Sequence, residues 1–426
     1  MATVNDQTQL LGLFKQVYAE KIRNAWLMRA PIASSITFET QDSTGDYYNA
    51  PIDLQLEQGV TYAASGVLPS GSGYLSPTAG KMENAQLAGA QYFGRSQVSY
   101  EAISRSARVS AAAFEKATSH VVKRLMFSLL KRFEIDLLHG GLGWGTIESV
   151  TGSGATRAFV ISDATWASGI WAGMKSATLD CFAANYSGAK INTTTAITIV
   201  SVDPATRTLN VSGLDAELTN CIAGCHFFPQ TQTPSTALYG LTKWASLTSA
   251  SGTVANIATG TFELWQSNQY NVAGQLSMQK VLAAVSMAFD YGLITGGKLI
   301  VSGRGFEQLN ADQAALRQYD VSYKPVSAQN GVEKLVYSGT AGDIEIMPHW
   351  AQKPGQALFY SPEPLKRIGS EELGFITRAG GEKLILESAD SPATEMRMYG
   401  NQNLFCDMPR HLVSLTGITS SSLGGA

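Results

Sequence analysis

The sequence predicts an α+β fold with extended arms, and three observations support that prediction. A long amphipathic helix pattern spans residues 107–139, and several short alternating strand patterns follow it. Residues 46–100 read as two strands joined by a stretch rich in Gly, Ser, Pro and Ala. Charged residues make up only 15% of the 426-residue chain, against roughly 25% in typical soluble domains. A surface so poor in charge suggests that neighbouring subunits cover much of it.

The N-terminal residues 1–45 are interpreted as an arm. Apolar side chains in residues 8–28, among them Phe14, fall near helical spacing, and Pro31 is expected to end this helix. The sequence does not open with a basic segment followed by an apolar run, so a signal peptide is not expected. Nor does any apolar run approach the length of a membrane span, and no membrane contact is expected.

Residues 46–105 are expected to form an extended loop with flanking strands. Apolar and polar positions alternate in DYYNAPIDLQLEQGVTY and again in QYFGRSQVSYEAI, and the segment between them has almost nothing to bury. The sequence therefore predicts a long hairpin with small residues at its tip. A two-stranded ribbon does not offset its own ordering entropy, so this arm is expected to lie on another surface.

Residues 106–145 carry the strongest helical signal in the chain. One side of the predicted helix is apolar and includes Leu129 and Phe133, while the opposite side is basic and includes Lys123, Arg124 and Lys131. From residue 105 to residue 132, seven Lys or Arg residues stand against one acid. The basic side is interpreted either as a contact for nucleic acid, a scaffolding partner or a neighbouring subunit, or as a solvated helix face. Aromatic residues are not interleaved with it, so sequence-specific nucleic-acid reading is not expected.

The rest of the chain alternates between β and α/β patterns. Residues 146–240 read as an inserted β-rich module, in which TAITIVSVD and TLNVSG form a hairpin around the turn at 204–207. Residues 241–390 read as α/β, with a helix capped by Ser277, the strand KLIVSG, a helix from GFEQLN, and the strands EKLVYSG, DIEIMPHW and QALFYSP. Residues 391–426 are expected to form two strands around Gly400.

Motifs for chemistry are weak, and no catalytic, cofactor-binding or metal-binding residues are assigned. In Cys221-Ile-Ala-Gly-Cys225-His226 the cysteine spacing is wrong for haem attachment, and zinc would need a further ligand such as Cys181 or Cys406. Buried structural thiols are the favoured interpretation. Phosphate-binding and nucleophile-elbow patterns are absent from the sequence. The four cysteines are too few for a disulfide scaffold and suit a reducing cytoplasm.

The order of these parts resembles the tailed-bacteriophage major capsid proteins with the Hong Kong 97-type fold. In that family an N-terminal arm precedes an extended loop, a spine helix, an axial α/β domain and strands that return to the peripheral domain. Here YYNAPIDLQLEQGVTY resembles the extended loop, and 106–145 the spine helix. KLIVSGRGFEQLN with DIEIMPHWAQKPGQALFYSPEPLKRIG resembles the axial domain, placed mainly in 241–390. MRMYGNQNLFCDMPRHLVSLTGI resembles the returning strands.

The resemblance implies a non-enzymatic subunit that assembles as hexamers and pentamers into an icosahedral shell. It implies packaged double-stranded DNA, contacted only non-specifically, which agrees with the formal net charge of −3. It further implies a portal, a cement protein, and assembly in the host bacterial cytoplasm into a virion. Scaffolding is expected to come from a separate scaffolding protein or from a prodomain that this sequence does not contain. Candidate subunit contacts are Phe14, Tyr62, Tyr74, Lys81, Tyr92, Lys123 and Arg124.

Two other classes of function stay open from the sequence. The first is a β-rich phage tail protein or surface adhesin built around residues 146–240, which predicts small oligomers of fixed size. The second is an enzyme that uses one of the five histidines. The long helix at 107–139 counts against the adhesin, and the 46–100 arm counts against the enzyme.

Overall fold

The computed structural model describes residues 30–40, 47–63, 74–106, 117–183, 190–234, 236–314, 335–339, 342–376, 385–387 and 392–419. The predicted helix at 8–28, with Phe14, lies outside these residues. Two units emerge from the contacts within the chain. Unit 1 comprises residues 1–46, 88–137 and 367–403, and unit 2 comprises residues 47–87, 138–366 and 404–426.

Unit 1 is built on one sheet with a long helix beside it. In this sheet β4 (Ala90–Ser99) pairs antiparallel with β20 (Ala393–Cys406), from Ala90 opposite Gln402 to Ser99 opposite Ala393. The sheet continues from β20 to β18 (Leu365–Phe375), and β1 (Phe38–Thr40) pairs parallel with β18. β19 (Ile385–Glu387) also pairs with β20. The helices are α1 (Pro31–Ser35), α2 (Tyr100–Ser106) and α3 (Ala117–His139).

Helix α3 packs closely on β4. Gly94 leaves room for Leu129, whose Cδ1 would clash with a Cβ at that position. The rings of Tyr92 and Phe133 meet edge to face at 5.5 Å between centroids. The carboxylate of Glu134 accepts hydrogen bonds from the backbone N–H of Ile32 at 2.8 Å, which fixes the start of α1. The predicted long helix is therefore confirmed over 117–139, and 107–116 lie outside the described residues.

Pro31 begins the short helix α1, because proline is tolerated in the first helical turn. The segment 8–28, which Pro31 was expected to end, lies outside the described residues. Three local predictions were wrong for identifiable reasons. QYFGRSQVS is β4 of unit 1 and not the second strand of the hairpin, which is KMENAQLA. Tyr100 begins helix α2 and does not extend a strand. Gly400 lies inside β20, where its missing side chain admits the backbone of Leu373, 3.0 Å from where a Cβ would be.

Unit 2 contains a closed six-stranded barrel with the neighbour order β10-β5-β6-β9-β8-β7. Its strands are β5 (Gly145–Thr151), β6 (Thr156–Ile161), β7 (Thr178–Phe182), β8 (Ile197–Asp203), β9 (Thr208–Ser212) and β10 (His226–Pro229). The predicted hairpin around 204–207 is confirmed as β8 and β9. Short helices η3 (Asp163–Thr165), α4 (Ser168–Trp171) and α5 (Asp215–Asn220) connect the strands.

A six-stranded mixed sheet forms the second part of unit 2, with the order β13-β21-β17-β14-β16-β15. The strands are β13 (Asn268–Gly274), β14 (Gly297–Val301), β15 (Leu335–Gly339), β16 (Gly342–Pro348), β17 (Gln356–Tyr360) and β21 (Val413–Ile418). Helices α7 (Met278–Phe289) and α8 (Gly303–Ala314) pack on the sheet around a common apolar core. The predicted Ser277 cap is confirmed, since its hydroxyl accepts the Lys280 N–H. β21 belongs to this sheet, whereas β20 pairs in unit 1, so residues 391–426 serve both units.

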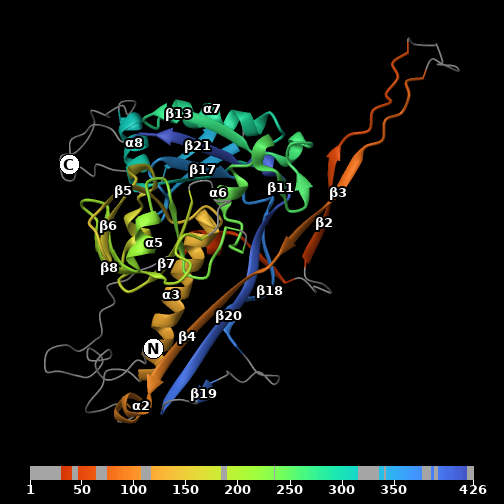
Figure 1. Ribbon diagram of the computed structural model, residues 1–426. Coiled ribbons are helices and arrows are strands. Elements are labelled where there is room, and N and C mark those ends of the chain that lie inside the picture. Colours follow the sequence, from red (N-terminus) through yellow and green to blue (C-terminus); the bar gives the residue numbers. More distant parts are fainter. Residues whose placement is uncertain are drawn as a thin grey trace, which may run out of the picture. The chain divides into compact units, whose positions relative to one another are not determined.

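The third part of unit 2 is a two-stranded arm of β2 (Tyr47–Gln55) and β3 (Lys81–Ala88), which projects from the rest of the unit (Figure 1). Smaller elements beside its base are α6 (Leu241–Trp244), η4 (Ser249–Ser251), β11 (Thr253–Val254), β12 (Ile257–Ala258), η5 (Glu263–Trp265) and η6 (Pro409–His411). Among the described helices, none has the length and apolar character that crossing a membrane requires.

Candidate functional site

Within its described residues, the β2–β3 arm is anchored at its base. At its base Ala50, Leu54, Ala85 and Leu87 are buried, and Gln86 donates its backbone N–H to Ala255 at 2.9 Å. Further out, paired backbone hydrogen bonds between Gln58 and Thr78 hold the two strands together. These two hydrogen bonds extend the hairpin beyond the ends of β2 and β3.

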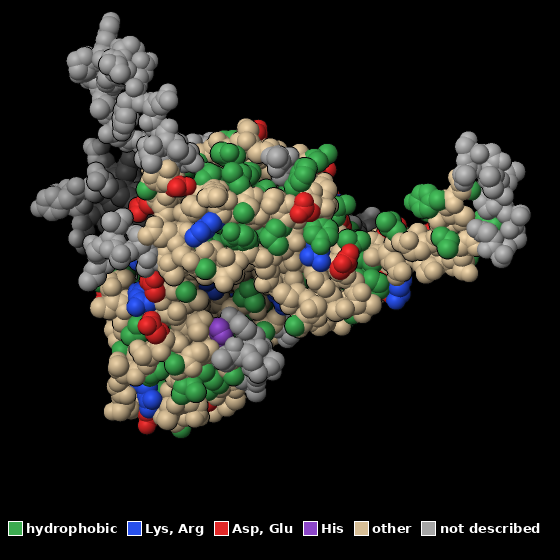
Figure 2. Space-filling view, turned by 90° about the horizontal axis from the view of Figure 1, so that it is seen from above, with side chains coloured by type: hydrophobic (Ala, Val, Ile, Leu, Met, Phe, Trp, Pro, Cys, Tyr) green, Lys and Arg blue, Asp and Glu red, His purple; other side chains and the backbone are tan. Residues whose placement is uncertain are grey.

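Beyond its base the arm exposes large apolar side chains, some of which are visible along the projection in Figure 2. Tyr62 is 92% exposed and Leu56 is 79% exposed. Exposed to more than half as well are Val60, Tyr74, Leu75 and Met82. Soluble monomers rarely expose so much contiguous apolar surface, and where they do the surface marks a site of interaction. The arm is therefore a candidate docking element.

Charges on the arm are mostly acidic. Asp53 and Glu57 are exposed. Lys81 lies 3.1 Å from the carboxylate of Glu83, and its ammonium group also lies 4.9 Å from the ring centroid of Phe262. The arm thus combines apolar and acidic groups, while its lysine contacts groups of its own unit.

The outer surface of α3 in unit 1 is basic and partly apolar. Lys123 and Arg124 are exposed, and Met126 and Phe127 are each 38% exposed. A surface cavity of about 150 Å³ lies between the helix and β4, lined by Ser96, Val121, Arg124 and Leu125. This surface has the charge opposite to that of the arm.

The prediction that Lys131 lies on the exposed basic face was wrong. Its side chain is buried, at 7% exposure. Burial, with the neighbouring charge of Arg132, lowers the pKa of Lys131 to about 8. The basic stretch in the sequence is therefore divided between exposed and buried positions.

The face of β4 and β20 opposite α3 carries a second charged group. Arg95 and Arg397 lie opposite each other across the strand pair, and both contact the buried carboxylate of Glu395. A hydrogen bond from Gln97, together with the two arginines, lowers the pKa of Glu395 to about 2. Since one carboxylate serves two guanidinium groups, this face also has a local excess of positive charge.

The other predicted contact residues divide into two groups. Tyr62, Tyr74, Lys123 and Arg124 are exposed, on the arm or on α3. Tyr92 is half-buried and donates its hydroxyl to Asp136 at 3.1 Å, and burial raises its pKa. Phe14 lies outside the described residues. Sequence analysis missed Leu56, Val60 and Met82, although an apolar residue in an arm with nothing to pack on is itself a signal.

The Cys221–Cys225–His226 cluster lies in the barrel wall, and all three side chains are buried. His226 Nδ1 pairs with the hydroxyl of Thr146 at 3.0 Å. Cys181 of β7 is buried as well, but among the described residues no group of His, Cys, Asp or Glu has a metal-binding arrangement.

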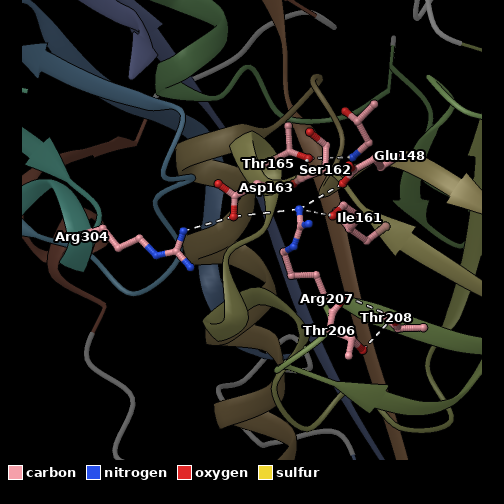
Figure 3. Close-up of polar contacts among 10 residues, drawn as sticks. Glu148, Ile161, Ser162, Asp163, Thr165, Thr206, Arg207, Thr208 and Arg304 are labelled. Atoms are coloured by element: carbon pink, nitrogen blue, oxygen red, sulfur yellow. Dashed lines mark hydrogen bonds and ion pairs between the residues drawn. The ribbon is translucent and has the colours of Figure 1, made fainter. Parts of the chain in front are cut away.

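Charged groups connect the barrel with α8 (Figure 3). Arg207, in the left-handed region with φ of 56°, donates to the Glu148 carboxylate and to the Ile161 carbonyl, both at 3.1 Å. Asp163 lies 4.0 Å from Arg207 and 3.1 Å from Arg304, the second residue of α8. The barrel is thus fastened to the six-stranded sheet's own helix within unit 2.

A buried polar joint lies beneath this connection. The ammonium of Lys353 donates to the Gly143 carbonyl, just before β5, at 2.8 Å. Burial lowers the pKa of Lys353 to about 7. His139 lies 3.0 Å from the Ala351 carbonyl and 3.2 Å from the Thr242 hydroxyl, and burial lowers its pKa as well. The Lys353 contact joins the segment before β5 to the loop between β16 and β17 within unit 2.

Comparison with known proteins identifies the fold. No family model and no curated protein sequence matches this chain. The capsid asymmetric unit of Cyanophage A-1(L) matches with a TM-score of 0.56 and 12% identity, covering 95% of this chain and 97% of that one. The chain has a phage capsid fold. The predicted Hong Kong 97-type fold is thereby confirmed.

Two further similar structures have lower scores. The capsid of the native GTA particle has a TM-score of 0.49 at 7% identity, covering 95% of both chains. Mycobacterium phage Bobi has a TM-score of 0.45 at 10% identity, covering 99% of this chain and all of that one.

Proposed function

We propose that this chain is the major capsid subunit of a tailed bacteriophage. It assembles as hexamers and pentamers into an icosahedral head around double-stranded DNA, and it is not an enzyme. The observation that supports this most is the near-complete match to a cyanophage capsid subunit, combined with an arm that exposes apolar groups. A β-rich adhesin would not require such an arm.

The arm of one copy docks on unit 1 of a second copy. Its exposed aromatic and aliphatic groups supply apolar contact area, as Tyr62 and Leu56 do, and Asp53 and Glu57 face the basic α3 surface at Lys123 and Arg124. Repeated in a closed symmetric shell, one such contact per subunit is multiplied many times. Apolar burial provides the affinity, and the opposite charges provide the register.

Other partners follow from the same proposal. The subunit is made in the bacterial cytoplasm and assembles there with a separate scaffolding protein, a portal and a cement protein. Packaged DNA contacts the wall only non-specifically, and the net charge of −3 gives the chain no basic excess that would hold the DNA tightly. The virion is then its final location.

Assembly is tested by negative-stain microscopy and sedimentation of the full chain, alone and with proteins encoded beside it. Shells, tubes, hexamers or pentamers are expected. Changing Leu56, Tyr62 and Tyr74 to serine should leave the subunit folded but unassembled. Val200→Ser, which removes an exposed apolar group from the barrel wall, is the matched control and should assemble. A small oligomer of fixed size under every condition would instead favour the adhesin.

The docking partner is tested by reversing charges. Lys123→Glu with Arg124→Glu should reduce assembly, and adding Asp53→Lys with Glu57→Lys should restore it. Failure of the second pair to restore shells, while unaltered protein assembles, would reject the proposed contact but not the capsid function.

A further inference from the structure

The sheet of unit 1 has an exposed face on the side away from α3. Gly94 of β4 faces α3, so its neighbours Phe93 and Arg95 point to the other side of the sheet. The register of β4 and β20 places Tyr399 opposite Phe93 and Arg397 opposite Arg95. These four side chains therefore lie together on one surface, which we call the outer sheet face.

Two aromatic rings form one half of the outer sheet face. The ring centroid of Phe93 lies 5.0 Å from that of half-buried Tyr399. Phe93 remains 67% exposed despite this contact. Aromatic residues are enriched in protein interfaces, where they supply contact area. This half of the face is suited to an apolar side chain of a partner.

Two arginines form the other half. Arg95 and Arg397 are opposite each other across the strand pair, and like charges in such positions are destabilising by themselves. The buried carboxylate of Glu395 offsets part of this repulsion, because one of its oxygens lies 2.7 Å from Arg95 Nη2 and the other contacts Arg397 Nε. Gln97 donates to the same carboxylate at 2.9 Å. Two positive charges thus share one negative charge.

The arginines keep N–H groups for a further anion. Each guanidinium group has five N–H donors, and one nitrogen of each contacts Glu395. Their side chains are 57% and 47% exposed, in the order Arg95 and Arg397. Because Glu395 already holds both arginines in place, a ligand does not have to order them on binding. One more carboxylate would balance the charge of the group.

We propose that the outer sheet face binds an acidic segment of a different protein. One carboxylate of that partner contacts Arg95 and Arg397, and a neighbouring apolar side chain packs on Phe93 and Tyr399. Arginine N–H groups match the planar geometry of a carboxylate, often with two parallel hydrogen bonds. Buried aromatic and arginine side chains are also the residues that contribute most to binding at protein interfaces.

The charge of the face favours a protein segment over nucleic acid. A nucleic-acid strand would need a basic groove along its phosphates, but the neighbouring positions on β4, Gln91 and Gln97, are uncharged. The arm of a second copy is not the occupant, because its acidic groups are assigned to the α3 surface. All residues of the outer sheet face belong to unit 1 of one chain, so binding does not depend on the proposed shell.

The test measures binding of two synthetic peptides to the full-length chain by calorimetry. The acidic peptide is acetyl-Leu-Glu-Phe-Glu-Leu-amide, and in its twin glutamine replaces both glutamates. At low salt the acidic peptide should bind at least about tenfold more tightly than the twin, and added salt should weaken its binding. Equal binding of the two peptides, or no binding of either, would overturn the proposal.

Variants locate the binding surface. Arg95→Gln and Phe93→Ser should each weaken binding of the acidic peptide by about tenfold. Both side chains are exposed and Arg95→Gln leaves Glu395 one arginine partner, so the midpoint of thermal unfolding should change little. Arg304→Gln and Tyr100→Ser alter side chains of similar exposure outside the outer sheet face, and these matched controls should bind as the unaltered chain does. Unchanged binding by Arg95→Gln would overturn the proposal.

Two further outcomes would assign the face to another partner and so overturn the proposal. Oligothymidylate that binds more tightly than the acidic peptide, and loses binding with Arg95→Gln, would identify a nucleic-acid surface. Assembly that Arg95→Gln abolishes, and that an excess of the acidic peptide leaves intact, would identify a second copy of the chain as the occupant. Assembly of the Arg95→Gln chain as of the unaltered chain is the expected result.

Discussion

The barrel and the β2–β3 arm are both built from strands of unit 2. They differ in how many neighbours each strand has and in whether its side chains are buried. Each barrel strand has a neighbour on both sides, and its inner side chains, such as Phe159 and Phe227, meet one another at 5.6 Å. Each arm strand has one partner in its two-stranded sheet, and Tyr62 meets solvent. Closure removes sheet edges and fills an interior. The arm keeps its exposed strand edges and encloses no interior, so its stability as an ordered element has to come from another surface.

The largest expected effect comes from truncating the barrel core. Phe227 is fully buried against Phe159, so Phe227→Ala should lower the free energy of unfolding by about 3–5 kcal/mol through lost burial and a residual cavity. Urea unfolding followed by tryptophan fluorescence measures it. A loss below about 1 kcal/mol would mean that the barrel is not the closed, packed body described here.

The free energy of unfolding should depend on pH through the buried Lys353, which contacts the segment before β5, and not through the arm. The folded-state pKa of Lys353 is about 7, below its ordinary 10.5. Between these values the unfolded chain binds a proton that the folded chain does not, so stability rises with pH, by up to about 1.4 kcal/mol per pH unit. Below about pH 7 the lysine is charged in both states and the gain is absent.

Lys353→Met removes the titrating group, so the unfolding free energy of this variant should rise less steeply with pH. Urea unfolding between about pH 7 and about pH 8 isolates the effect, because Lys131 and Lys243, with pKa values of about 8, act mainly above that range. An equally steep rise in the variant would assign the effect to another group.

A smaller effect is expected at the exposed connection from the barrel to α8. The Arg304 side chain is 55% exposed, and its ion pair with Asp163 is open to solvent on both sides. Arg304→Ala should therefore cost less than about 1 kcal/mol and less still at high salt. Thermal unfolding at low and high salt tests this, and a large salt-independent loss would show that the pair is more than a surface contact.

The smallest stability effect should come from the arm itself. Tyr62 is 92% exposed, so Tyr62→Ser should change the unfolding free energy of the isolated subunit by no more than about 0.5 kcal/mol. Denaturation of unassembled protein measures it. A loss comparable to that of Phe227→Ala would mean that the arm packs on its own subunit, and the contrast between barrel and arm would fail.

The elements predicted correctly are those whose signals lie in neighbouring residues of the sequence. The 3.6-residue period found α3, the Ser277 cap found α7, and strict alternation found the β8–β9 hairpin. The errors came from long-range pairing. The strand KMENAQLA was missed because its buried positions include Ala85, whose small side chain gives a weak apolar signal. Gly400 resembles a turn in sequence, and only the approach of Leu373 explains it.

The candidate site was predicted in part. The arm was found because a long segment without a core needs an external partner, and Tyr62 and Tyr74 belong to it. The burial of Lys131 was missed, since helical spacing places it on the polar side and tertiary packing is not visible in the sequence.

Strand β21 has a consequence for the order in which the protein can fold during synthesis. It lies between β13 and β17, pairing parallel with one and antiparallel with the other, although β13 precedes it by well over a hundred residues. The ribosome delivers the chain at about 5–20 residues per second, so β13 waits many seconds for its neighbour. The barrel, whose strands are adjacent in sequence, can close meanwhile. Such late, non-local closure is intrinsically slow. It would keep an unfinished chain from competing with complete subunits for partners.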